Sequence, residues 1–356
     1  MKRLHDFASQ PDTIEEGRAM NETRKIAAIA LLLAWMPSIC AADTHRLDVG
    51  GVNLTVEMDS AVRAGDDGYP WTEWLITTLQ ATRTVTGDFP RDVVRIKLEG
   101  TSRSSNAIAF GQVRRSRPPQ LRFYVAPDAS LEGLNADWRG YHEFAHLLIP
   151  FPGNDDIWFT EGFASYYQYL LQSRSGVISQ QQAWEELLAG FERGESDRSG
   201  RGWTLRSLSP KMWHERAQKR VYWTGAAFFL RIDTRLRTET EDAHSLDKTL
   251  AAFHECCMDR HRRWNAERLI DILGELSVPE IWQQEYHRSI DARAEPRYRE
   301  AIARLGISRS RGGLQLDASA RAKALRNAIA GARSPMGTGR LATPEPMRQE
   351  SGSVAP

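Results

Sequence analysis

The sequence predicts an α+β fold, with a small β-sheet in the amino-terminal part and a mainly helical part after it. Segments in which apolar and polar residues alternate, as in half-buried strands, are concentrated before residue 140. Longer apolar and amphipathic runs, typical of helices, follow residue 172. Between the two regions, residues 141–167 contain the pattern H-E-x-x-H, on which the functional prediction is built.

The composition is that of a globular protein, because 41% of the residues are hydrophobic and 26% are charged. The formal net charge of +1 does not favour nucleic acid as a partner. Three cysteines, Cys40, Cys256 and Cys257, are too few for a disulfide framework. A bond between the adjacent pair would close a small, strained ring, and the sequence does not indicate a role for that pair.

Residues 1–42 are predicted to be an amino-terminal extension and a signal peptide. A basic pair precedes an apolar run at 26–39, which is shorter than the roughly 20 residues that a membrane-spanning helix needs. We expect translation to start at Met20 and cleavage to follow Ala42. The mature protein would then be periplasmic or secreted, without stable membrane insertion; a retained membrane anchor is the alternative.

The region before the motif is expected to form a small sheet with one helix. Residues 45–58 alternate in polarity and are read as one or two strands, and a helix is expected over 71–85. Further strands are expected at 93–98, 107–113 and 121–126, the last two separated by a basic, proline-containing turn.

The central motif consists of His142, Glu143 and His146. On a helix, residues i and i+4 lie one turn apart on the same face, so both imidazoles can reach one metal ion. Glu143 would project beside them, where its carboxylate can take a proton from a metal-bound water. The apolar neighbours favour a buried helix, which Pro150 and Pro152 end.

Glu161 is the expected third ligand. It is predicted to open a second helix over 161–172, and a helix–turn–helix path would return it to His142 and His146. Two histidines and one glutamate leave the fourth position of zinc open for water, as in catalytic rather than structural sites. We therefore expect one Zn²⁺ per chain.

The chain after residue 172 is expected to be mostly helical. We expect a folded domain over 43–331, a polar loop at 192–202 and a disordered tail at 332–356. The remaining expected elements are helices at 180–191, 220–237, 281–290 and 298–305, then a closing strand at 314–316 and a helix at 320–329.

A second metal site is conceivable further along the chain. His254, Cys257 and His261 have a spacing that places them on one helical face. Cysteine and histidine on a helix are more often buried or incidental, so the incidental interpretation is favoured.

Residues 142–146, followed by Trp-Phe-Thr-Glu-Gly-Phe-Ala-Ser-Tyr at 158–166, resemble the gluzincin metallopeptidases, and most closely their glycyl aminopeptidase-like branch. The segment Tyr222-x-x-Gly225-Ala resembles a further motif of that family. The resemblance implies a thermolysin-like catalytic domain similar to that of aminopeptidase N. It also places on Tyr222 the hydrogen bond to the oxyanion of the tetrahedral intermediate.

Two features differ from the family pattern. Fourteen residues separate His146 from Glu161, where many gluzincins have eighteen, so Asp155 and Asp156 remain alternative ligands. The glycine-x-methionine-glutamate-asparagine segment, which holds the free amine of the substrate in aminopeptidase N, is not found. Aminopeptidase and endopeptidase activity therefore both stay open.

The expected activity is hydrolysis of peptide bonds in a peptide or protein substrate, with Glu143 as the base and Tyr222 at the oxyanion. In the resembled fold a strand edge beside the metal holds the substrate backbone, and 107–113 or 121–125 could serve. The alternative is a catalytically inactive gluzincin-like module that binds a peptide or protein partner. The oligomeric state is not indicated.

Overall fold

The structure is a computed structural model, and it describes residues 43–62, 70–102, 105–258, 263–310 and 312–333. The predicted signal peptide and nearly all of the predicted tail lie outside these residues. Within the described ranges, no helix combines the length and the apolar character that crossing a membrane requires.

The expected amino-terminal sheet is present and has five strands in the order β1-β2-β3-β5-β4. β1 and β2 form a hairpin, turned by Gly50 and Gly51 at φ of +61° and +86°. β2, β3 and β5 run parallel to one another, whereas β4 pairs antiparallel with β5 and is an edge strand. The strands are β1 (Asp43–Val49), β2 (Val52–Met58), β3 (Val93–Gly100), β4 (Ile108–Arg114) and β5 (Gln120–Val125).

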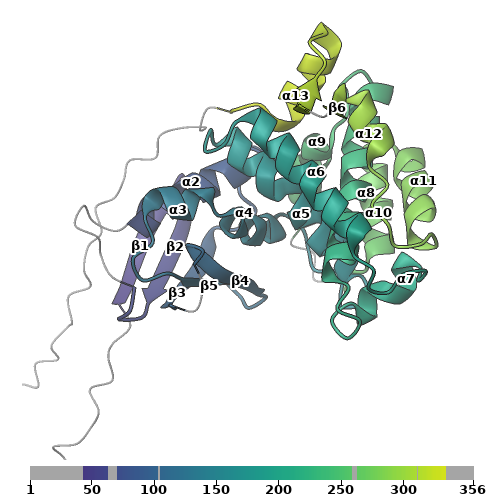
Figure 1. The fold of residues 1–356 in the computed structure, drawn as a ribbon. Helices are drawn as coiled ribbons and strands as arrows, with labels where there is room; N and C mark the ends of the chain where they lie inside the picture. Colours follow the sequence, from purple (N-terminus) through teal and green to yellow (C-terminus); the bar gives the residue numbers. More distant parts are fainter. Residues whose placement is uncertain (1–42, 63–69, 103–104, 259–262, 311, 334–356) are drawn as a thin grey trace, which may run out of the picture. The chain divides into compact units, whose positions relative to one another are not determined.

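The crossover between the parallel strands β2 and β3 is the helix α2 (Pro70–Arg83), as expected from its apolar face. Its side chains Trp74, Leu75 and Leu79 are fully buried against the sheet. The Trp74 ring meets the Phe123 ring of β5 edge-on, with centroids 5.1 Å apart. α2 therefore closes the hydrophobic core of the sheet (Figure 1).

The helical part is centred on α5 (Ile157–Arg174) and α8 (Gln218–Glu239) (Figure 1). α5 is buried on all sides, and only Ile157 and Glu161 are partly accessible. The surrounding elements are α3 (Leu131–Ala136), α4 (Trp138–Ala145), α6 (Gln180–Ser196), α7 (Leu205–Leu208), α9 (Leu246–Cys256), α10 (Ala266–Glu275), α11 (Pro279–Ile290), α12 (Arg299–Arg304), β6 (Ile307–Ser310), β7 (Gly313–Leu316) and α13 (Ala320–Ala330).

Two helix boundaries differ from the prediction by four residues or more. α5 begins at Ile157 rather than at Glu161, because Trp158 and Phe159 are drawn into the helical core. α6 continues to Ser196, so residues 192–196 of the polar segment expected to be a loop at 192–202 are helical instead. In α6, Gly194 lies against Trp223 and leaves no room for a side chain.

α4, which carries the H-E-x-x-H motif, lies between the two hydrophobic cores. Phe144 belongs to the core of the sheet, whereas Tyr141 and Ala145 belong to the helical core. The α-helix ends at Ala145, and His146 opens a short 3₁₀ turn, η2 (His146–Leu148), instead of continuing it. The backbone of His146 remains helical, with φ −57° and ψ −22°, so His142 and His146 still share one face.

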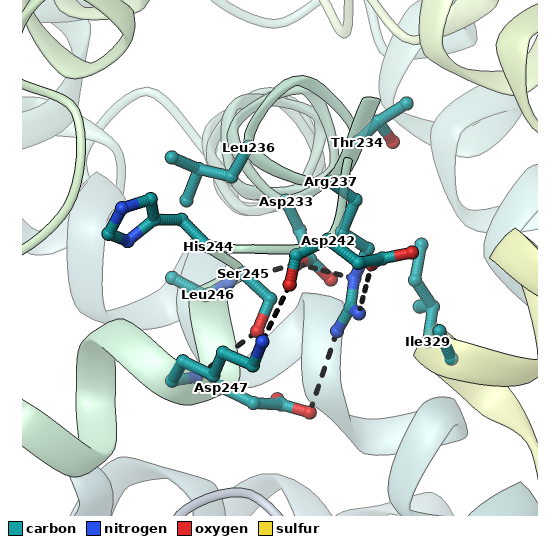
Figure 2. Close-up of polar contacts among 12 residues, drawn as sticks. Asp233, Thr234, Leu236, Arg237, Asp242, His244, Ser245, Leu246, Asp247 and Ile329 are labelled. Atoms are coloured by element: carbon teal, nitrogen blue, oxygen red, sulfur yellow. Dashed lines mark hydrogen bonds and ion pairs between the residues drawn. The ribbon is translucent and has the colours of Figure 1, made fainter. Parts of the chain in front are cut away.

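Two buried aspartates join the central helices to α9. Asp233 of α8 accepts a hydrogen bond from the Tyr166 hydroxyl of α5 at 2.8 Å. It also accepts hydrogen bonds from Arg237 Nε at 3.0 Å and from the backbone N–H of Leu246 at 2.9 Å. In Figure 2, Arg237 extends from Asp233 to Asp242, to which it donates at 3.1 Å.

Asp247, in the first turn of α9, is the second of these aspartates. It accepts hydrogen bonds from the Tyr167 hydroxyl at 2.8 Å and from Arg174 Nη2 at 2.9 Å. Arg333 donates to the same carboxylate at 2.8 Å, and Arg237 lies 3.8 Å from it. Burial would raise the pKa of Asp247, but the three guanidinium groups outweigh burial and lower that pKa. The ionised carboxylate therefore joins α5, α8, α9 and the segment after α13.

Replacing Asp247 by asparagine should lower the free energy of unfolding by about 3–5 kcal/mol, because it leaves buried guanidinium groups without their carboxylate. Urea denaturation at pH 7 measures this change. The matched control is Asp242→Asn, in the same network but with 53% of its side chain exposed, which should cost less than about 1 kcal/mol. Equal losses in the two variants would contradict the assignment.

The stabilisation that Asp247 provides is also expected to depend on pH. Because the fold lowers the pKa of Asp247, its stabilisation is present above the unfolded-state pKa of about 4 and is lost as the pH falls through the folded-state pKa. The difference in stability between the wild type and Asp247→Asn should therefore narrow below about pH 4.

Candidate metal centre

Three side chains that can ligate a metal converge between α4 and α5. His142, His146 and Glu161 each offer one ligand atom, and these atoms lie within 4.8 Å of one another. Nε2 of His142 is 3.2 Å from Oε2 of Glu161, and Nε2 of His146 is 3.7 Å from Oε1. No other described group of histidine, cysteine, aspartate and glutamate side chains has such spacing.

The structure brings Glu161, and neither of the two alternative aspartates, to the histidines. Asp155 is exposed, and Asp156 accepts a hydrogen bond from the backbone N–H of Ala266 at 2.8 Å. Because α5 begins at Ile157, Glu161 already lies in the second turn of that helix. The connection of fourteen residues is thus long enough to reach α4.

Asp137 fixes the start of the helix that carries the motif. Its carboxylate caps α4 by accepting a hydrogen bond from the backbone N–H of Arg139 at 3.1 Å. It also accepts one from the backbone N–H of Ile108, the first residue of β4, at 3.2 Å. One buried carboxylate therefore holds the edge strand beside the motif.

α5 also orients both imidazoles through side chains that the sequence analysis did not single out. Nδ1 of His142 lies 2.9 Å from Oε1 of Gln168, and Nδ1 of His146 lies 3.0 Å from Oγ1 of Thr160. An acceptor on Nδ1 places the proton there and leaves the lone pair on Nε2. Thr160 directly precedes Glu161 and Gln168 follows it by two turns, a spacing that could have indicated them.

This donor set fits a zinc ion. Two Nε2 atoms and one carboxylate face a common point, and each histidine has an acceptor on its other nitrogen, the arrangement typical of zinc-binding histidines. Burial lowers the pKa of His146 to about 3. Burial would raise the pKa of Glu161, but both imidazoles outweigh it and hold that pKa at about 2. These two groups therefore have the deprotonated forms that metal ligation requires.

Glu143 lies next to this cluster and under the edge strand. Burial, together with the charge of Glu161, raises the pKa of Glu143 to about 7, although His142 and Arg115 oppose the rise. A carboxylate with a pKa near neutrality can both accept and return a proton. Gly111 of β4 makes this position possible, because a Cβ there would lie 2.6 Å from Cγ of Glu143.

Tyr222 of α8 completes the group. Its ring stacks on the His142 ring, with centroids 6.3 Å apart and an angle of 16° between the planes. Burial and the negative charge of Glu161 and Glu143 raise the pKa of Tyr222, so its hydroxyl keeps its proton and can donate it to an anion. The structure thus gathers all five of the predicted site residues.

Glu161 and Tyr222 meet because α5 and α8 cross with their backbones in contact. The crossing point is formed by Gly162 and Gly225. A Cβ on Gly225 would lie 2.2 Å from the carbonyl oxygen of Trp158, and one on Gly162 would lie 2.4 Å from Cα of Gly225. Both glycines appear in the quoted motifs, yet their packing role was not predicted.

A cleft of about 460 Å³ opens over the cluster. β4 and the loop after it form one wall, and Tyr222 and Trp213 belong to the other. Phe110 and Trp213 are 53% and 59% exposed, and they are two of the three large hydrophobic side chains exposed in the described part of the chain. A second cavity of about 680 Å³ shares His142 and Tyr222 with the cleft.

The sheet topology distinguishes the two candidate substrate strands. β5 is paired on both sides, by β3 and β4, so its backbone groups are engaged. β4 is paired on one side only, and four consecutive residues from Phe110 to Val113 line the cleft. β4 is therefore the strand that can receive an extended peptide.

The loop after β4 contributes a residue that the sequence analysis treated only as part of a basic turn. The guanidinium of Arg115 lies over the Phe151 ring, 4.1 Å from its centroid, and lines the cleft. Its charge acts on both Glu143 and Glu161. No local pattern distinguishes it from Arg114 and Arg117.

The candidate second metal site is not supported. Cys256 and Cys257 form a disulfide, which leaves no thiolate for a metal. Nε2 of His254 lies 2.6 Å from the carbonyl oxygen of Leu148, and His261 lies outside the described residues.

One known protein family matches part of the chain. The model of the family described as M61 glycyl aminopeptidase matches residues 152–227. The matched segment contains Glu161, Gly162, Tyr222 and Gly225 and begins after the two histidines. The predicted gluzincin resemblance is confirmed. No curated protein sequence matches the chain.

Similar solved structures were also found. A structure described as an aminopeptidase N family protein from Idiomarina loihiensis is 13% identical, with a TM-score of 0.57 over 74% of this chain and 49% of that chain. A mutant M1 zinc metallopeptidase from Deinococcus radiodurans, bound to a Tyr-Ser-Ala substrate, is 16% identical, with a TM-score of 0.47 over 71% and 52%. This chain thus spans about half the length of these proteins. The first match confirms the α+β architecture.

Gly225→Ala should lower the free energy of unfolding by about 1–3 kcal/mol, because the added methyl group forces α5 and α8 apart. It should also weaken zinc binding, since Glu161 moves with α5. Denaturation and a competitive metal titration measure the two effects. The control is Gly133→Ala in α3, where a Cβ would lie 3.3 Å from its nearest neighbour and the change should stay under about 1 kcal/mol. A Gly225→Ala protein as stable as the control would contradict the close crossing.

Proposed function

We propose that this chain is a zinc-dependent metallopeptidase that hydrolyses peptide bonds. The observation that supports this most strongly is the convergence of two oriented imidazoles and one carboxylate beside a second, protonatable carboxylate. The family match to a peptidase over residues 152–227 supports the same assignment. The fold similarity to an aminopeptidase N family protein is consistent with it.

His142, His146 and Glu161 would hold the zinc ion. When bound, zinc polarises the scissile carbonyl and makes the attacking water more acidic. Gln168 and Thr160 keep the two imidazoles in the tautomer that ligation requires.

Glu143 is the proposed general base and general acid. It takes a proton from the attacking water and passes it to the leaving amine, which requires a pKa close to the working pH. Its carboxylate is buried beside β4, so it is adjacent to any peptide that pairs with that strand.

Tyr222 is the proposed oxyanion donor. Its raised pKa keeps the hydroxyl protonated, and its ring is held against His142 at the mouth of the metal site. β4 would pair with the substrate backbone, and the exposed rings of Phe110 and Trp213 would contact apolar side chains on either side of the scissile bond.

Export to the periplasm or the medium is part of the proposal and rests on the signal peptide predicted at residues 20–42. The alternative, a module that binds a peptide without cleaving it, would be expected to lack a ligand or the base. The three proposed ligands and the proposed base are all present and lie together, so the geometry favours the enzyme.

Glu143→Gln should keep its fold and bind zinc, yet lose activity by about 10²- to 10⁴-fold, because the amide cannot accept the proton. The assay is a mixed peptide library with products read by mass spectrometry, with and without a chelator, together with metal analysis. The matched control is Glu132→Gln on the exposed surface of α3, which should keep full activity. Activity retained in Glu143→Gln would exclude Glu143 as the base.

Tyr222→Phe should lower kcat by about 10²- to 10³-fold with unchanged zinc content, because it removes one donor to the oxyanion. Steady-state kinetics on one peptide identified from the library measures this. Tyr298→Phe is the control, since it also removes a tyrosine hydroxyl, one that donates to Glu195 away from the cleft. An unchanged kcat in Tyr222→Phe would remove this residue from the mechanism.

A further inference from the structure

We propose that Arg115 binds a carboxylate of the substrate, so that the cleft selects a peptide with a negative charge near the scissile bond and disfavours a free α-amine there. The inference rests on the proposed peptidase function and specifies its substrate class.

Arg115 is positioned to meet a ligand. It follows the last residue of β4, lines the cleft and is exposed to solvent there. Its guanidinium is supported from one side by the Phe151 ring at 4.1 Å. Within the described chain, Arg115 forms no ion pair; its guanidinium lies over the Phe151 ring, and its charge also acts on Glu143 and Glu161. Its planar group of donors therefore remains available to a carboxylate.

The other arginine in the cleft is already neutralised. Nη1 of Arg139 donates to both carboxylate oxygens of Asp137, at 3.0 and 3.1 Å, and its guanidinium lies over the Trp138 ring. Among the described residues of the cleft lining, Arg115 is therefore the cationic side chain that a substrate can neutralise.

Among the described residues that line it, the cleft has no further group that would bind an ammonium ion. Its carboxylates are Glu143 and Glu161, and both already have roles in the proposed chemistry. An aminopeptidase needs a further acidic group at this point, whereas the chain has Arg115, which repels an ammonium ion. In the second cavity, Glu185 and Glu186 are balanced by Arg193 and Lys219.

Two sources can supply the carboxylate: the carboxyl terminus of a short peptide or an acidic side chain within a longer one. Both would form charge-assisted, bidentate hydrogen bonds with a guanidinium. Such bonds correspond to a preference of about 10- to 100-fold over a neutral analogue.

The test uses three matched pairs of peptides built on one sequence that the wild-type zinc enzyme cleaves. The pairs are a free against an amidated carboxyl terminus, glutamate against glutamine next to the scissile bond, and a free against an acetylated amino terminus. We expect kcat/KM to be about 10- to 100-fold higher for the anionic member of the first or the second pair, which identifies the source. In the third pair the acetylated peptide should be cleaved at least as fast. A requirement for the free amine would overturn the proposal.

The variants assign this preference to Arg115. Arg115→Gln should remove the preference between the two members of the pair, and Arg115→Glu should reverse it in favour of a lysine-containing peptide. Arg117→Gln, in the same turn but outside the cleft lining, should keep the preference. A preference that survives in Arg115→Glu would exclude this residue.

A binding measurement separates this inference from the proposed function. Calorimetry on the Glu143→Gln protein loaded with zinc should show tighter binding of the anionic peptide, by about tenfold or more, and equal affinities would overturn the proposal. If the wild type with stoichiometric zinc cleaves no peptide while this preference in binding persists, the peptidase function fails and the carboxylate site stands. If the wild type cleaves peptides but prefers those with a free amine, the peptidase function stands and the carboxylate site fails.

Discussion

The crossing of α5 and α8 at Gly162 and Gly225 is the contact on which the rest of the site depends. Helices that meet through side chains lie about 8–10 Å apart, and two glycines allow a closer approach. Glu161 directly precedes one of these glycines, and Tyr222 lies one turn before the other. The separation of Glu161 and Tyr222, the proposed metal ligand and the proposed oxyanion donor, is therefore set by backbone packing in the interior.

α5, which forms this crossing, also carries many polar side chains for a buried helix. Thr160, Glu161 and Gln168 engage His142 of α4 and His146 of η2. Tyr166 and Tyr167 bind buried aspartates on the opposite side of α5. Buried polar groups are stable when each has a partner, and a fully connected set also fixes one arrangement of the helices. The same contacts thus hold the core together and orient the metal site.

Much of the architecture could be predicted because it is encoded in local periodicity. Alternating residues indicated the strands, and the i, i+4 spacing placed His142 and His146 on one face. Whether Glu161 reaches the two histidines depends on the path of residues 149–156, which periodicity does not describe. That prediction therefore rested on the motif. The cleft contribution of Arg115 and the start of α5 at Ile157 were missed, because both depend on contacts between segments distant in the sequence.

The cleft has one wall from each hydrophobic core, since β4 with its following loop extends from the sheet and Trp213 and Tyr222 come from the helical part. A bound peptide would contact both the sheet and the helical part, which otherwise meet mainly through α4. Its binding energy would then resist their separation, so occupancy of the cleft raises the melting temperature of the protein as a whole. A bound substrate would therefore also stabilise the contact between the sheet and the helical part.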